Sequence, residues 1–331
     1  MCRSDFIKKT YTFKYTGRFQ GRSVPSQRRA LYCLRAVLLS PLILIELRSL
    51  FGYRKSRSRL ATTFLNDITN STLGKGLDFG NFTICFIRNR LDKSTKQNPK
   101  LLPQKSEITE SINSELIKFG FSKVPGFISS DLARALLQET FNMSGYCRPS
   151  QKSLRHNEWL DSPDRGPRFD VDQSSIARSK EIDIVANKPL LLEIAREYLG
   201  CSPILASVQI WTTRPPQVFN ANVLDESAMA FHCDSDYFGF LKFFVLLTEV
   251  NPENGPFTFV SESHRGRRHV VGRMKDSEVI TPTDVLHLGT GRPGDLVIAD
   301  TKGWHKAAPP KCGVRTMLQI VYTSSLFGAP V

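Results

Sequence analysis

The sequence predicts a mainly β fold with flanking helices, in which short antiparallel strands form a double-sheet jelly roll. From residue 204 onward, five short runs rich in β-branched and aromatic residues follow one another between Pro, Gly and Asn turns. No helical segments alternate with these runs, as a doubly wound sheet would require. The chain has 331 residues, of which 40% are hydrophobic, and this is ample for a large core.

The expected elements follow in order along the chain. Residues 107 to 119 and 131 to 143 are expected to be helices, separated by a turn-and-strand segment, FGFSKVPGF. A further helix is expected over residues 189 to 199, where Gly200 ends it. The strands are expected at residues 204 to 211, 241 to 250, 256 to 260, 295 to 300 and 315 to 324.

Charge divides the chain into two parts. Residues 1 to 105 carry 21 Lys and Arg against 5 Asp and Glu, a net charge of +16, whereas the remaining residues carry 24 against 26, a net charge of −2. Residues 92 to 106 are polar, contain two prolines and lack apolar periodicity, so they mark the expected linker. The sequence therefore predicts a basic N-terminal extension over residues 1 to 105 and a main domain over residues 107 to 331. Because the main domain is nearly neutral, a nucleic-acid partner is not expected.

An apolar segment lies within the basic extension, at residues 30 to 51. Arg35, Pro41 and Glu46 interrupt it, so it is too short and too charged to span a bilayer. It fits an amphipathic segment that contacts an anionic membrane surface, aided by four basic residues between positions 54 and 59. A helix packed on the main domain is the other interpretation, and a targeting presequence is a further one for the basic arm.

The cysteines bear on the cellular compartment. All seven lack paired spacing, and their odd number argues against a secreted disulfide framework and against a CxxC zinc site. We therefore expect a reducing compartment and a cytoplasmic location, with peripheral membrane contact through the basic extension as an addition. The sequence does not indicate an oligomeric state.

Three residues are candidate metal ligands. His232 and Asp234 are two positions apart, and an extended segment would point both side chains to the same face. His305 follows a separate predicted strand and would complete the group. Two imidazoles and one carboxylate leave three adjacent positions open on a six-coordinate metal, as in non-haem Fe(II) oxygenases. A lone His-x-Asp pair also arises by accident. Other divalent metals bind the same ligands as well.

Arg315 opens the last predicted strand, ten residues after His305. By the period of two it shares one face of that strand with Met317 and Gln319. A buried guanidinium needs an anion, and its planar fork matches a carboxylate bidentately. An acidic side chain of the sheet would satisfy Arg315, but the upstream histidine favours a dicarboxylate cosubstrate.

Two longer segments carry these residues: FHCDSDYFGFLKFFVLLTEVNPENGPFTFVSESHRG and GDLVIADTKGWHKAAPPKCGVRTMLQIVY. In order and spacing they resemble the phytanoyl-CoA dioxygenase family of Fe(II)- and 2-oxoglutarate-dependent oxygenases, over about residues 107 to 325. The resemblance implies a double-stranded β-helix, cupin-like core, with Fe(II) on His232, Asp234 and His305. It also implies 2-oxoglutarate held at its far carboxylate by Arg315, and O2 as the second cosubstrate.

The same resemblance implies lesser contacts to the cosubstrate. Ile210 and Phe244 correspond to positions that line the 2-oxoglutarate pocket in the family. Lys242 shares the face of Phe244 and would add a second cation there, unless it is a solvated lysine at the strand end. Ala307 stands where some members carry a serine, so the hydrogen bond that a serine hydroxyl would make to the cosubstrate is not expected here. Residues 154 to 172 are expected to form a loop near the site that bears on specificity.

The expected reaction is hydroxylation of an unactivated C–H bond in a small organic or lipid-like substrate, with release of succinate and CO2. Asp234 favours hydroxylation, because halogenating relatives lack this carboxylate to make room for halide. Nucleic-acid demethylases of the same fold carry a second arginine where this chain has Val321, which disfavours that activity. The alternative hypothesis is a catalytically inactive family member that acts as a membrane-associated interaction protein.

Overall fold

A computed structural model of the chain describes residues 26–41, 50, 60–91, 106–148, 150, 152–217, 223, 227–265 and 272–328. The basic arm up to residue 25 lies outside the described residues, as do the basic cluster at positions 54 to 59 and nearly all of the expected linker. Of the apolar segment expected at residues 30 to 51, the structure describes residues 30–41 and residue 50.

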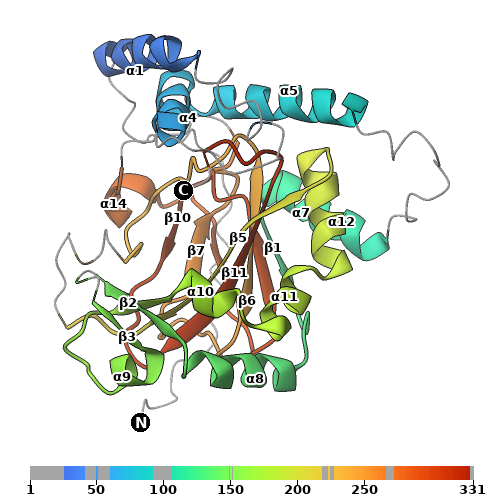
Figure 1. Cartoon of the computed structure of the whole chain (residues 1–331). Helices are drawn as coiled ribbons and strands as arrows, with labels where there is room; N and C mark the ends of the chain where they lie inside the picture. The colour runs from blue at the N-terminus through green and yellow to red at the C-terminus, as the bar shows by residue number, and fades with distance from the viewer. Residues whose placement is uncertain are drawn as a thin grey trace.

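Two antiparallel sheets form the core (Figure 1). The large sheet has the strand order β1-β9-β6-β11-β5-β4-β2-β3, and the small sheet has the order β10-β7-β8. The strands of the large sheet are β1 (Phe121–Val124), β9 (Leu296–Ala299), β6 (Phe240–Leu246), β11 (Arg315–Thr323), β5 (Ile204–Thr213), β4 (Arg168–Val171), β2 (Ser144–Arg148) and β3 (Ser153–Arg155). Those of the small sheet are β10 (His305–Ala307), β7 (Phe257–Val260) and β8 (Leu286–Leu288). The mainly β, jelly-roll fold predicted from the sequence is confirmed.

Side-chain alternation gives the large sheet two buried faces. Ile210 and Leu318 form a cross-strand pair on the outer face, within the cluster that the helices cover. Trp211 and Met317 form the next pair, on the opposite face, and belong to a cluster that includes Phe257 of the small sheet. We call this second face, which looks toward the small sheet, the inner face. Residues one position apart on a strand therefore lie in different environments.

Helices cover the outer face. α12 (Pro189–Leu199) packs on β6, β11 and α7 (Glu107–Phe119), and both helices have the bounds expected from the sequence. Gly200, in the left-handed region at φ 81°, ends α12. The helix expected over residues 131 to 143 is α8 (Ser130–Thr140), which ends three residues early. The shorter helices are α9 (His156–Leu160), α10 (Gln173–Ile176), α11 (Lys180–Ala186) and α14 (Asp276–Val279).

Three N-terminal helices form a layer over one end of the sheets (Figure 1). They are α1 (Ser26–Leu39), α4 (Leu60–Thr72) and α5 (Lys75–Leu91). α1 packs on α4, where Arg35 donates to both carboxylate oxygens of Asp67 at 2.6 and 2.7 Å. Phe64 of α4 packs with Phe238 and Phe327 of the main domain. None of the described helices is both long enough and apolar enough to cross a membrane.

Candidate metal and cosubstrate site

Backbone pairing brings the predicted metal ligands together. His232 lies in an isolated bridge with His305, the first residue of β10. The amide of each histidine donates to the carbonyl of the other, with N–O distances of 2.9 and 3.0 Å. Asp234 N donates to Thr301 O at 2.9 Å. Main-chain hydrogen bonds therefore fix both ligand-bearing segments relative to each other.

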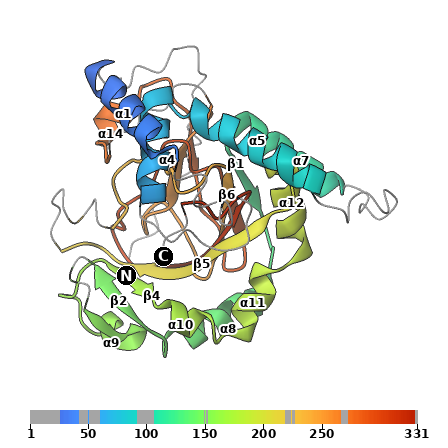
Figure 2. The same cartoon turned by 45° about the horizontal axis from the view of Figure 1, so that its top comes forward.

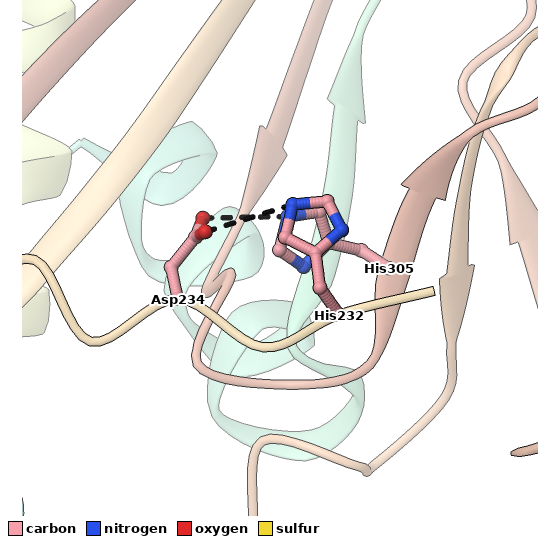
Figure 3. Close-up of side chains that lie close together, drawn as sticks. All are labelled: His232, Asp234 and His305. Atoms are coloured by element: carbon pink, nitrogen blue, oxygen red, sulfur yellow. Dashed lines mark ion pairs between the residues drawn. The ribbon is translucent and has the colours of Figure 1, made fainter. Parts of the chain in front are cut away.

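The imidazole rings are oriented to bind a metal through Nε2. Nδ1 of His232 lies 2.9 Å from Ala230 O, and Nδ1 of His305 lies 2.9 Å from Gly303 O. A carbonyl oxygen only accepts, so each Nδ1 carries a proton, and the neutral form of each ring then presents the lone pair of Nε2 to a metal. The two Nε2 atoms lie 3.7 and 3.3 Å from the carboxylate oxygens of Asp234, and the three donor atoms lie within 4.8 Å of one another (Figure 3). This donor set fits Fe(II).

Lys242 is the counter-ion of the carboxylate in this group. Its Nζ lies 2.7 Å from Asp234 Oδ2 and 3.0 Å from Asp236 Oδ2. Burial alone would raise the pKa of Asp234, but Lys242 and then His305 hold that pKa well below its ordinary value. Burial, together with His305, lowers the pKa of His232. The group therefore presents an ionised carboxylate and a neutral imidazole, the forms that bind metal ions.

Arg315 lies on the inner face of the large sheet. Its side chain is completely buried, and its three guanidinium nitrogens have no hydrogen-bond partner among the residues that the structure describes. Thr213 pairs with Arg315 on one side and with Arg168 on the other, so the two arginines share a row across three strands. Burial and the charge of Arg168 lower the pKa of Arg315 to about 9. A buried guanidinium with unused donors fits a carboxylate such as those of 2-oxoglutarate.

Aromatic side chains line the inner face between these groups. Phe244 lies with its ring centroid 6.1 Å from that of Trp211 and 4.9 Å from that of Phe257. Phe257 in turn lies 5.5 Å from the ring of His305. The structure thus places Phe244 on the same face as Arg315 and in an apolar wall that reaches a candidate metal ligand.

The structure corrects the expectation for Ile210. This side chain faces the helices on the outer face, in the cluster that contains Leu318, and is not brought to the site. Its neighbours Gln209 and Trp211 lie on the inner face instead, because strand side chains alternate. The expectation was one residue out of register, and a count in steps of two back from Thr213, the partner of Arg315, finds Trp211.

Arg168 was missed because residues 154 to 172 were expected to form a loop. The structure instead forms β3, α9 and β4 across this range. Arg168, the first residue of β4, donates to Asp170 Oδ1 from Nε at 2.9 Å and from Nη2 at 2.6 Å. Its guanidinium carbon lies 4.8 Å from the ring of Trp211. The strand is four residues long and alternates charged with apolar residues, which was a weak signal in a segment rich in Pro and Asp.

Contacts between the N-terminal helices and the ligand-bearing segments were also not expected. Asn66 of α4 and Ser235, the residue after Asp234, are joined by a side-chain hydrogen bond. Lys302 Nζ, three residues before His305, lies 3.0 Å from Asp78 Oδ1 of α5. No sequence pattern relates positions so far apart in the chain.

Comparison with known proteins gives one family. The model of the family "Phytanoyl-CoA dioxygenase (PhyH)" matches residues 118–313. The matched range includes His232, Asp234 and His305 and ends two residues before Arg315. No curated protein matches the sequence of this chain.

Solved structures that match this chain include three proteins of low sequence identity. HygX from Streptomyces hygroscopicus, with nickel and 2-oxoglutarate bound, is 16% identical, with a TM-score of 0.47, over 66% of this chain and 87% of HygX. The epimerase SnoN, in complex with Fe3+, alpha ketoglutarate and nogalamycin RO, is 17% identical, with a TM-score of 0.45, over 65% of this chain and 83% of SnoN. AviO1 from Streptomyces viridochromogenes Tue57 is 12% identical, with a TM-score of 0.45, over 69% of this chain and 99% of AviO1. The family match spans more than half of the chain, and the chain therefore belongs to the phytanoyl-CoA dioxygenase family.

Proposed function

We propose that this protein is an Fe(II)- and 2-oxoglutarate-dependent dioxygenase that hydroxylates an unactivated C–H bond of a small organic or lipid-like substrate. Family membership supports 2-oxoglutarate-dependent oxygenase chemistry with Fe(II) and O2. The observation that carries the proposal for this chain is Arg315, a buried cation whose guanidinium nitrogens have no hydrogen-bond partner within the described part of the chain. It lies on the face that also leads to the candidate metal ligands.

His232, Asp234 and His305 would hold Fe(II) through the two Nε2 atoms and the carboxylate. When bound, Fe(II) and 2-oxoglutarate supply the oxidation of a C–H bond to an alcohol by O2, with release of succinate and CO2. The protein keeps the ligands in their binding forms. The ammonium of Lys242 holds the Asp234 carboxylate ionised, and the carbonyls of Ala230 and Gly303 fix the tautomers of the histidines.

Arg315 would bind the far carboxylate of 2-oxoglutarate with two parallel hydrogen bonds. Arg168 adds a second positive charge in the same row, so an anion in this position is attracted by both. Phe244, Phe257 and Trp211 form an apolar wall that excludes water from the space beside these groups. In a dry environment the attraction between guanidinium and carboxylate is stronger than in water.

Anaerobic titration with Fe(II) and 2-oxoglutarate tests this proposal. We expect a visible charge-transfer absorption, followed by slow formation of succinate when O2 is admitted. His305→Ala and Arg315→Gln should lose both signals, whereas Arg134→Gln, which changes an exposed arginine, should keep them. Absence of absorption and of bound iron in the unmodified protein would refute the enzymatic function and support an inactive family member. With a substrate found by screening, incorporation of oxygen from labelled O2 into the product distinguishes hydroxylation from other oxidations.

We also propose that residues 1 to 105 form a basic N-terminal extension that makes peripheral contact with anionic membranes. Exposed apolar side chains gather on two of its helices, and the extension has a net charge of +16. They are Leu31, Leu34, Val37 and Leu38 of α1 and Phe79, Phe82, Phe86 and Leu91 of α5. An apolar helix face with surrounding positive charge suits the interface of an anionic bilayer.

Co-sedimentation with lipid vesicles tests the membrane contact. The protein should bind phosphatidylglycerol-containing vesicles and not pure phosphatidylcholine vesicles. The double variant Leu34→Ser, Phe82→Ser should bind at least about tenfold more weakly, because each substitution removes apolar area from the contact with the membrane. Ile184→Ser changes an equally exposed side chain of α11 and should bind normally. Equal binding of both variants would refute the proposed surface.

A further inference from the structure

Two cysteines that are distant in sequence meet where the N-terminal helices contact the main domain. Cys85 lies on α5 and Cys201 follows α12 by two residues. Their Sγ atoms are 2.8 Å apart, although the residues are separated by 116 positions. Both side chains are buried, with exposed fractions of 6% and 3%. The two sulfur atoms would have to approach by only about 0.75 Å to form a disulfide, whose S–S bond is about 2.05 Å.

The surrounding contacts hold the two sulfur atoms in place. α5 crosses the C-terminal end of α12 (Figure 2), and its polar side chains cap the last carbonyls of that helix. Asn81 Nδ2 donates to Leu199 O at 3.3 Å, and Asn89 Nδ2 donates to Gly200 O at 2.9 Å. These bonds lie one turn on either side of Cys85, so the position of its Sγ is fixed by both neighbouring turns.

The electrostatic environment distinguishes the two thiols. Arg88 Nη1 lies 3.7 Å from Cys201 Sγ, and it also donates to Ser324 O at 2.7 Å, which orients the guanidinium. The hydrogen bond from Cys85 and then the charge of Arg88 lower the pKa of Cys201. The same hydrogen bond and burial raise the pKa of Cys85. Cys201 is therefore the thiol of the pair that ionises more readily to the nucleophilic thiolate, and Cys85 donates a hydrogen bond to it.

We propose that Cys85 and Cys201 form an oxidation site, at which a peroxide converts the two thiols into a disulfide that ties the N-terminal helices to the main domain. The pairing was not visible in the sequence, where the cysteine spacing indicated free thiols. The site does not depend on the proposed dioxygenase activity, because none of its residues lies in the metal or cosubstrate group.

The chemistry balances with hydrogen peroxide as the oxidant. The Cys201 thiolate attacks one peroxide oxygen, the O–O bond breaks, and Cys201 becomes a sulfenic acid while the departing hydroxide takes up a proton as water. The Cys85 sulfur then attacks the Cys201 sulfur, the S–O bond breaks, and the second oxygen leaves with the proton of Cys85 as water. Two thiols and one peroxide give one disulfide and two waters, so sulfur loses two electrons and peroxide gains two.

The disulfide would act on the helices that contact the ligand-bearing segments. α5 carries Cys85 and also Asp78, the partner of Lys302. A covalent bond at Cys85 would therefore oppose separation of this helix from the segment that precedes His305. It would also close a loop of more than one hundred residues, which restricts the unfolded chain.

Peptide mapping of the full-length protein tests the proposal. Reduced protein is treated with a series of hydrogen peroxide concentrations, the remaining thiols are alkylated, and the protein is digested with trypsin and chymotrypsin without reductant. We expect a linked peptide containing Cys85 and Cys201, two hydrogens lighter than the sum of its parts. It should form at lower peroxide concentrations than oxidation products of the exposed Cys33. The melting temperature should rise by about 5 °C or more and return on reduction.

Variants separate this site from general oxidation. Cys85→Ser and Cys201→Ser should lose the linked peptide and the rise in melting temperature. Cys147→Ser should keep both, because Cys147 is also buried but lies beside the hydroxyl of Ser150, at 3.0 Å. Free thiols at both positions after Cys33 has been oxidised would overturn the proposal. The map of the unmodified protein decides this even where a variant does not fold.

Discussion

Asp78 on α5 and Lys302, three residues before His305, form an ion pair with 3.0 Å between Oδ1 and Nζ. Lys302 is almost fully buried and also lies 3.3 Å from Asp300 Oδ2, whereas the Asp78 side chain is 49% exposed. An ion pair with a half-exposed partner contributes little to stability. The pair instead marks where the N-terminal layer touches the site, and the tighter contact there is the packing of Phe238 on Gly80.

We expect Gly80→Ala to destabilise the protein. Alanine normally stabilises a helix by up to about 1 kcal/mol relative to glycine. A Cβ at Gly80, however, would lie 2.3 Å from Cδ1 of Phe238, whose buried ring is held by Phe327. The free energy of unfolding, measured with urea, should fall by about 1–3 kcal/mol. Thr83→Ala on the exposed side of the same helix should cause no such loss, and equal stability of both variants would contradict the packing.

Arg315→Met should stabilise the ligand-free protein and abolish binding of 2-oxoglutarate. The wild type buries a charge that lacks a partner among the described residues, and Arg168 repels it. Removing that charge should raise the free energy of unfolding by about 1–3 kcal/mol. Thermal denaturation should show that 2-oxoglutarate raises the melting temperature of the wild type but not of this variant. Arg134→Met, an exposed change, should leave both properties unchanged. A less stable Arg315→Met protein would show that the guanidinium is satisfied without a ligand.

Lys242→Met should make metal binding more sensitive to acid. The charge of Lys242 opposes the effect of burial and is the largest cause that lowers the pKa of Asp234, so its removal should raise that pKa. A carboxylate binds metal only when ionised, so on acidification the variant should lose metal at a higher pH than the wild type. Titration with Co(II), followed by its visible absorption from pH 8 to pH 5, measures the two midpoints. Lys311→Met, which removes an exposed partner of Glu253, should match the wild type. Coincident curves for Lys242→Met and the wild type would exclude this role.

His156 should make the fold sensitive to acid. Burial lowers the pKa of this histidine to about 4, below its ordinary value of 6.5. The unfolded chain therefore takes up a proton between pH 6.5 and 4 while the folded protein does not, and stability present above pH 6.5 is lost as the pH falls. Phenylalanine at position 156 can keep the stacking on Phe169 but does not titrate. Between pH 6.5 and 4, the free energy of unfolding of His156→Phe should therefore fall less steeply than that of the wild type, by about 1.4 kcal/mol per pH unit. Urea unfolding at several pH values measures it. The exposed Asn157→Ala should keep the wild-type slope, and a parallel slope for His156→Phe would contradict the assignment.

Much of the fold and the central group of the site follow from local patterns. The helices over residues 107 to 119 and 189 to 199 have strong periodicity and clear ends, and the structure gives them these bounds. Arg315 is the first residue of β11, where alternation fixes the direction of its side chain. His232 lies in an isolated bridge and Asp234 lies outside the described strands, so long-range main-chain hydrogen bonds position these two residues. The roles of these residues, of Lys242 and of Phe244 as metal and cosubstrate contacts stay predictions.

Other features depend on pairings that a linear pattern does not contain. Ile210 was assigned to the cosubstrate pocket from the family resemblance, and a shift of one residue along a strand moves a side chain to the other face of the sheet. Cys85 and Cys201 lie on elements that are adjacent only after the N-terminal helices have packed on the main domain. The same holds for Asp78 and Lys302. Such contacts connect distant parts of the chain, and the spacing of residue types carries no information about them.

The reciprocal hydrogen bonds between residues 232 and 305 are made by the main chain, so they do not use the imidazole side chains. Folding and metal chemistry are therefore encoded by different atoms of the same two residues. A lineage that lost either histidine would keep its scaffold and could diverge toward new roles. In the laboratory, both positions are open to exchange for other ligands, which makes this jelly roll a template for building metal centres of different selectivity.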